Sequence, residues 1–206
     1  MENLYKLFLG IHILSGFTAL VTGFIAIVAQ KGKKVHKKAG IIFFMGMILV
    51  CISATLISLI KQNQFLLHIG IFSFFLVYSG FRSVQHKSLY PNIMDWIVLL
   101  IVILNCAIML FTNQIVLIVF GAIGSFLAIR DAKLLYGVKT NKITQKNVWI
   151  IRHIGMMLGG YIATFTAFLV VNVSMASLPW LPWLLPTIIG TPLIAYWTSK
   201  YQPKKN

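Results

Sequence analysis

Acidic residues are almost missing from this sequence, which holds only 3 Asp and Glu against 18 Lys and Arg in 206 residues. The acids Glu2, Asp95 and Asp131 are too few to build a Ser-His-Asp triad. Charged residues of both signs make up only 10% of the chain, whereas a soluble domain carries about 25%. The shortage of charge therefore argues against a soluble fold, and the shortage of acids argues against a hydrolytic triad.

Cysteine is equally scarce, because Cys51 and Cys106 each stand alone inside an apolar run. Two isolated cysteines do not indicate a disulfide framework, and they lack the spacing of a zinc site. Cys51 shares a predicted helix face with Ala54 and Ser58, since residues three or four apart lie on one side of a helix. We therefore expect both cysteines to be small buried residues.

Apolar residues dominate instead: they make up 59% of the chain and gather in long blocks that are nearly free of charge. Such blocks are typical of membrane-spanning helices. The blocks predict an all-α, polytopic transmembrane helix bundle that forms one integral membrane domain over residues 1–206. Its seven predicted spans are about 7–30, 39–60, 65–81, 96–112, 115–136, 148–173 and 184–201.

The positive charges predict the orientation of these spans. All Lys and Arg except Lys6 and Lys61 fall in alternate loops, at the ends of the spans beside them, or in the C-terminal tail. The segment 31–40 (KGKKVHKKAG) is predicted as one of these basic loops. The positive-inside rule then places the N-terminus outside and the C-terminus inside. A net charge of +15 would suggest nucleic acid in a soluble protein. Here we expect no nucleic acid, and the predicted partners are the lipid bilayer and its anionic lipid headgroups.

Glycine and proline predict where the later helices end or bend. Gly137 is a typical residue at which a helix stops. The segment from Leu178 to Pro186 (LPWLPWLLP) is predicted as an interfacial segment outside the membrane, because its prolines resist helix. The segment Gly190-Thr191-Pro192 predicts a kink that interrupts the last span near mid-membrane.

The histidines fall into two predicted layers, with His12 and His68 near the outer surface. His36, His86 and His153 lie near the inner surface. Two histidines on facing helices can ligate a haem iron from both sides. Candidate pairs for haem b are therefore His12 with His68 and His36 with His153. In the alternative interpretation, His36 and His86 are interfacial loop residues, and the other three make hydrogen bonds between helices.

A second candidate site is a cluster of charged residues near the inner surface. Its members are Arg82, Asp95, Arg130, Asp131 and Arg152. An unpaired charge at such depth costs about 2.5–3.5 kcal/mol, so ion pairs are expected. The preferred pairing joins Asp131 to Arg152 or to Arg82. Such a network either fixes the packing of the helices or forms an anion or proton site that opens to the cytoplasm.

Four stretches resemble a family of bacterial integral membrane proteins, the domain of unknown function 2306 family. They are HILSG, KGKKVHKKAG, RHIGMMLGGYIATFTAFLVVN and WLLPTIIGTPLIAYW. The resemblance covers essentially all 206 residues. It implies a multi-pass fold and location in the bacterial inner (plasma) membrane, and it supplies no activity.

Three functions from different classes agree with these residues. The first is a b-haem-binding or other membrane redox protein that uses the histidine pairs. The second is a small-solute or proton transporter that uses the inner Arg/Asp/His cluster, with His153 as the titrating group. The third is a non-catalytic membrane scaffold or accessory subunit in which every polar residue serves packing. The sequence itself assigns no catalytic residue and no bare metal site.

Overall fold

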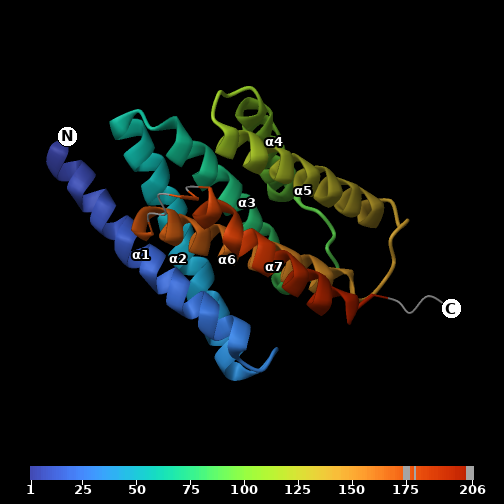
Figure 1. The fold of residues 1–206 in the computed structure, drawn as a ribbon. Helices are drawn as coiled ribbons and strands as arrows, with labels where there is room; N and C mark the ends of the chain where they lie inside the picture. Colours follow the sequence, from blue (N-terminus) through green and yellow to red (C-terminus); the bar gives the residue numbers. More distant parts are fainter. Residues whose placement is uncertain (174–176, 179, 203–206) are drawn as a thin grey trace.

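A computed structural model describes residues 1–173, 177–178 and 180–202. Within these residues the protein is entirely helical, with seven helices and no strand (Figure 1). The helices are α1 (Glu2–Val28), α2 (Lys34–Lys61), α3 (Gln64–Gln85), α4 (Ile93–Leu110), α5 (Ile115–Lys139), α6 (Val148–Asn172) and α7 (Leu181–Ser199). The predicted all-α class is thus confirmed.

Six of these helices, α1 to α6, are long and apolar enough to cross a membrane. Each has at least 18 residues and carries a strongly apolar stretch with few charges. α7 is 19 residues long and is not among these six. The protein is therefore a bundle of the membrane-embedded type, with six helices of spanning length.

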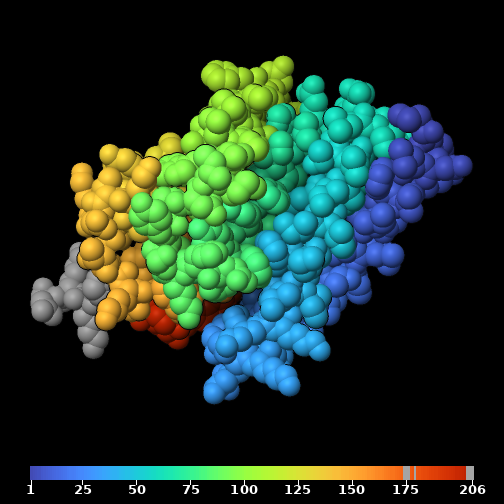
Figure 2. All heavy atoms as spheres, turned by 180° about the vertical axis from the view of Figure 1, so that it is seen from behind, coloured from blue at the N-terminus to red at the C-terminus, as the bar shows by residue number. Residues whose placement is uncertain are grey.

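The helices pack around α3, which contacts α2, α4, α5 and α6. α1 lies along α2, α4 pairs with α5, and α7 lies on α6 (Figure 1). Seen from behind, the α4–α5 pair and the α1–α2 pair lie on opposite sides of the bundle (Figure 2). One end of the molecule therefore gathers the C-terminal ends of the odd-numbered helices, α1, α3, α5 and α7. The N-terminal ends of α2, α4 and α6 lie at the same end.

Small residues permit the close packing of these helices. Cys51, Ala54 and Ser58 are all buried, so the small face predicted for the second span is confirmed. A side chain at Gly80 of α3 would meet Met157 of α6, with its Cβ only 2.6 Å from Cγ. The backbones of α3 and α6 approach closely for this reason, as small residues allow in membrane bundles.

Three predicted boundaries were wrong, each near the basic end of the bundle. The segment predicted as a basic loop is largely helical, because α2 begins at Lys34. The fourth helix begins at Ile93, where the side chains of Asn92 and Asp95 cap its first turn reciprocally. The fifth helix continues past Gly137 to Lys139. A helix can extend beyond the bilayer, so neither the charged residues nor Gly137 marked these helix ends.

The two proline segments near the C-terminus also differ from prediction. α7 begins at Leu181, within the predicted interfacial segment, and holds Pro182 in its first turn, where a proline costs no hydrogen bond. Pro179 lies outside the described residues. The helix is also continuous through Gly190 and Pro192, where an interruption was predicted. A Cβ at Gly190 would collide with Ile162 of α6, so this glycine serves close packing.

Candidate functional site

Two histidines from distant parts of the chain lie side by side at the basic end of the bundle. His36 is in the first turn of α2, and His153 is in the second turn of α6. Their ring centroids are 6.4 Å apart, and the ring planes are inclined at 84°. His36 was predicted as a loop residue, which was wrong, because the helix begins before it. The inner candidate pair of His36 with His153 is brought together.

Both rings are held through Nδ1 by a backbone carbonyl of another helix. Nδ1 of His36 lies 2.9 Å from the oxygen of Ala26. Nδ1 of His153 lies 2.9 Å from the oxygen of Gly80. A carbonyl only accepts, so each Nδ1 donates its hydrogen and each neutral ring keeps a free lone pair on Nε2. Histidines that ligate metals usually have this arrangement, with the second nitrogen donating to a carbonyl or a carboxylate.

A cavity of about 710 Å³ lies beside the two histidines. It is enclosed by the ends of α1, α3 and α7 and the starts of α2 and α6, and its lining is mainly apolar. The large apolar and aromatic side chains of this lining include Phe43, Phe81, Met157, Tyr161 and Trp197. Gly40 also lines the cavity, one helical turn from His36, and a Cβ there would meet no atom within 4 Å. The cavity thus leaves open space directly beside an imidazole.

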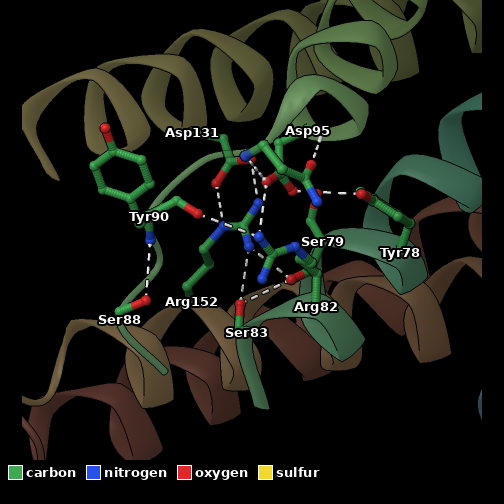
Figure 3. A network of polar contacts seen from close by, with 10 residues as sticks. Tyr78, Ser79, Arg82, Ser83, Ser88, Tyr90, Asp95, Asp131 and Arg152 are labelled. Carbon is green, nitrogen blue, oxygen red and sulfur yellow. Dashed lines mark hydrogen bonds and ion pairs between the residues drawn. The ribbon is translucent and has the colours of Figure 1, made fainter. Parts of the chain in front are cut away.

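The residue before His153 belongs to a buried ion network (Figure 3). Arg152 donates to both carboxylate oxygens of Asp131, from Nε at 2.5 Å and from Nη2 at 2.7 Å. Its Nη1 donates to the carbonyl of Ser79 at 2.9 Å and to the hydroxyl of Ser83 at 3.0 Å. The side chains of Arg152 and Asp131 are only 2% and 1% exposed. The preferred pairing of Asp131 with Arg152 is confirmed, and it ties α5, α6 and α3 together.

A second ion pair joins the end of α3 to the start of α4 (Figure 3). Arg82 donates from Nη2 to Asp95 at 3.2 Å and to the carbonyl of Tyr90 at 3.2 Å. The same carboxylate accepts the backbone N–H of Asn92 at 2.9 Å and the hydroxyl of Tyr78 at 3.4 Å. Asp95 therefore caps α4 and anchors α3 with one side chain.

Arg130 lies apart from both ion pairs. It is exposed, and within the described chain it makes no hydrogen bond or ion pair. The cause is the helical repeat, which turns successive residues of α5 by about 100°. Asp131 therefore faces the bundle while Arg130 faces outward, so the network holds four of the five predicted charged residues.

The outer histidines each bond to a different helix and do not pair with each other. Nδ1 of His12 lies 3.0 Å from Oγ of Ser53. Nδ1 of His68 lies 2.7 Å from Oδ1 of Asn105, whose amide in turn donates to the carbonyl of His68 at 3.1 Å. These contacts join α1 to α2 and α3 to α4. The structure thus gives these two residues interhelical hydrogen bonds, and it separates the outer candidate pair.

Several contributors to the site were not predicted from the sequence. Ser83 and the carbonyls of Ser79 and Gly80 accept hydrogen bonds from the two polar side chains of α6, Arg152 and His153. Backbone acceptors carry no sequence signal. The spacing of Ser79 and Ser83, four residues apart beside Arg82, was the one pattern that could have indicated a polar face.

Comparison of the chain with protein-family models, with curated proteins and with solved structures finds no match.

Proposed function

We propose that this protein is a multi-pass membrane protein that binds haem b between His36 and His153. The observation that carries the proposal is the pair of imidazoles beside a mainly apolar cavity, each with Nδ1 fixed on a carbonyl. Bound haem would supply one-electron redox chemistry. The protein residues would ligate the iron, orient the ring and exclude water from it.

The spacing of the two rings fits one metal between them. A histidine nitrogen lies about 2 Å from a metal that it ligates, so two imidazoles on opposite sides of one metal have centroids roughly 6 Å apart. The observed separation is 6.4 Å. A bare zinc ion would need four ligands, but within the described residues no group of three or more His, Cys, Asp or Glu could hold a metal ion. Haem needs only the two axial ligands from protein.

The cavity also fits the size and chemistry of such a ligand. Pockets for small molecules and cofactors have volumes of roughly 300–1,000 Å³ and mainly apolar linings. The cavity here measures about 710 Å³ and has aromatic side chains from α2, α3, α6 and α7 in its wall. The space beside Gly40 would admit a flat ring next to the imidazole of His36.

We further propose seven spans, with the N-terminus outside and the C-terminus inside, in the bacterial inner (plasma) membrane. The alternation of helix directions places Lys31, Lys87 and Lys142 at one end of the bundle, as the positive-inside rule requires of a cytoplasmic face. α7 is the seventh span in this proposal, with prolines of the kind that membrane helices tolerate. Anionic lipids are the expected neighbours of this basic face, and membership of the domain of unknown function 2306 family is part of the same proposal.

The proposal is tested by reconstituting the purified protein with haem and recording its optical spectrum. We expect a low-spin Soret band that is replaced by a high-spin band, or lost with the haem, in His36→Ala and in His153→Ala, because each variant removes one of the two imidazoles that would hold the haem. His86→Ala is the matched control, since His86 is exposed at the end of α3 and does not line the cavity. His12→Ala should also keep the band. A band that survives both inner substitutions, or no band in the wild type, contradicts the proposal.

The transport alternative has less support in the geometry. A transport site needs a charged group that can exchange partners, but both oxygens of Asp131 are committed to Arg152. The carboxylate of Asp95 likewise accepts from three donors, one of which is the backbone N–H of Asn92 in the helix cap. The charged network therefore favours a structural role, in which it fixes the helices that carry the histidines.

A further inference from the structure

The mouth of the histidine cavity carries an excess of positive charge. The lysines that line the cavity are Lys31, Lys37, Lys87 and Lys200, and its lining contains no acid. Every acid in the sequence is committed elsewhere: Glu2 pairs with Lys61 at the opposite end of the bundle, and Asp95 and Asp131 pair with arginines. Within residues 1–173, 177–178 and 180–202, these lysines therefore have no carboxylate partner.

Two of the lysines contact neutral groups instead. Nζ of Lys31 donates to carbonyl oxygens at the end of α1, including that of Ala26 at 3.2 Å, and lies 5.1 Å from the ring centre of Trp197. Nζ of Lys87 lies 4.9 Å from the ring centre of Trp149. Burial without a counter-ion lowers the pKa of Lys31. An anion at the mouth would stabilise the charged form of each ammonium group.

We propose that the cavity selects a ligand with an apolar body and carboxylates at one end, and that Lys31, Lys37, Lys87 and Lys200 bind those carboxylates. This inference rests on the proposed function and specifies its ligand class, a tetrapyrrole dicarboxylate. The apolar wall and the two histidines take the ring, and the basic mouth takes the acid groups. The ligand therefore has one orientation, with its carboxylates toward the basic end of the bundle.

Two kinds of anion fit this basic mouth: the carboxylates of the ligand and the phosphates of lipid headgroups, which are also negatively charged. The test compares haem with its dimethyl ester, which has the same ring and iron but no carboxylate. Both are titrated into the full-length protein in nanodiscs of zwitterionic lipid and, separately, of lipid with an anionic fraction.

We expect the wild type to bind the ester about tenfold more weakly than haem in zwitterionic lipid, because hydrogen bonds between charged groups supply that difference. The double variant Lys31→Gln/Lys87→Gln should reduce this ratio to about threefold or less. Lys133→Gln/Lys142→Gln is the matched control. It removes the same charge from exposed positions that do not line the cavity, and should keep the wild-type ratio.

The outcomes separate this inference from the proposed function. Equal affinities for haem and its ester in zwitterionic lipid, with both lost in His36→Ala, would overturn the carboxylate site and leave the haem site standing. A third outcome is that haem affinity depends on the anionic fraction of the lipid and not on the carboxylates of the ligand, and that this dependence disappears in Lys31→Gln/Lys87→Gln. The lysines would then bind lipid phosphate, and the inference would be wrong. No binding of either compound would overturn both.

Discussion

Arg152 and His153 are adjacent residues of α6 that bond to adjacent carbonyls of α3. Arg152 donates to the carbonyl of Ser79, and His153 donates to the carbonyl of Gly80, the next residue of α3. The first contact is reinforced by the ion pair with Asp131, which holds the start of α6 against α3. The ion pair thus fixes the position of the imidazole without touching the cavity.

Replacing Asp131 with Asn should lower the free energy of unfolding by about 3–5 kcal/mol, because the substitution leaves the guanidinium of Arg152 buried without its counter-ion. The measurement is thermal or denaturant unfolding of the purified protein in detergent. Arg130→Gln is the matched control: it alters the neighbouring charge, but Arg130 is exposed, so its effect should stay within about 0.5 kcal/mol. Equal effects of the two substitutions would show that the ion pair contributes nothing.

Residue-scale prediction from the sequence succeeded where a group had few possible partners. Three acids serve the whole chain, so the cost of an unpaired charge nearly dictated the pairing of Asp131. Residue-scale prediction was weaker for His36. This histidine stands among lysines, and its alternative interpretation was a residue at the level of the lipid headgroups. Its place beside His153 depends on how α2 and α6 approach each other in three dimensions, and the local sequence does not carry that information.

The elements of this fold are positioned by contacts between helix backbones. α3 and α6 approach closely at Gly80 and Gly160, where a Cβ would lie 2.6 Å from Met157 and 2.7 Å from Val77. This contact brings the carbonyl of Gly80 within reach of His153. The close packing of α3 against α6 therefore also sets the orientation of the imidazole of His153.

Gly80→Ala should destabilise the protein by about 1–3 kcal/mol, because the added methyl group forces α3 and α6 apart. It should also weaken haem binding, since His153 would lose its carbonyl partner. The comparison is Gly155→Ala in the same pair of helices, where a Cβ would meet no atom within 4 Å. That variant should be neutral or stabilising by up to about 1 kcal/mol. Unfolding and haem titration of both variants test the prediction, which fails if Gly80→Ala is tolerated as well as Gly155→Ala.

Prediction of the elements from the sequence was good for their existence and poor for their ends. Long apolar runs located every helix, because burial in lipid requires such runs. Lys34 to Lys38 were assigned to a loop, since lysine cannot enter the hydrocarbon core, but the helix continues into the interfacial region where lysine is accepted. The prolines of α7 also misled. Pro182 lies in the first turn, where a proline costs no backbone hydrogen bond, and the helix continues through Pro186 and Pro192.

At the scale of the whole molecule, the orientation gives a labelling prediction. The native Cys51 and Cys106 are only 4% and 0% exposed, so a membrane-impermeant maleimide should modify introduced cysteines alone. In right-side-out vesicles, Asn3→Cys should be labelled at once. Lys142→Cys, in the loop after α5, should be labelled only after the membrane is opened. The reverse pattern would contradict the proposed orientation.

The same assay decides whether α7 is a span. If α7 crosses the membrane, Gln202→Cys lies on the inner side and is protected in intact vesicles, like Lys142→Cys. Labelling of Gln202→Cys in intact vesicles, with Lys142→Cys still protected, would mean that α7 remains on the outer side. The expected result is protection, because Trp197 of α7 and Lys200 directly after it line the cavity beside His36 at the basic end.

The histidine cavity is built from helices that lie far apart in the sequence. α1 and α2 provide the wall that holds His36, whereas α6 and α7 provide His153 and Trp197. A ribosome releases the earlier helices first, so His36 emerges long before the last wall of the cavity exists. A ligand of this cavity can be enclosed only after translation and insertion of α7 are finished. Under the proposed function, an empty form of the protein therefore precedes the bound form, and haem enters a fully inserted chain.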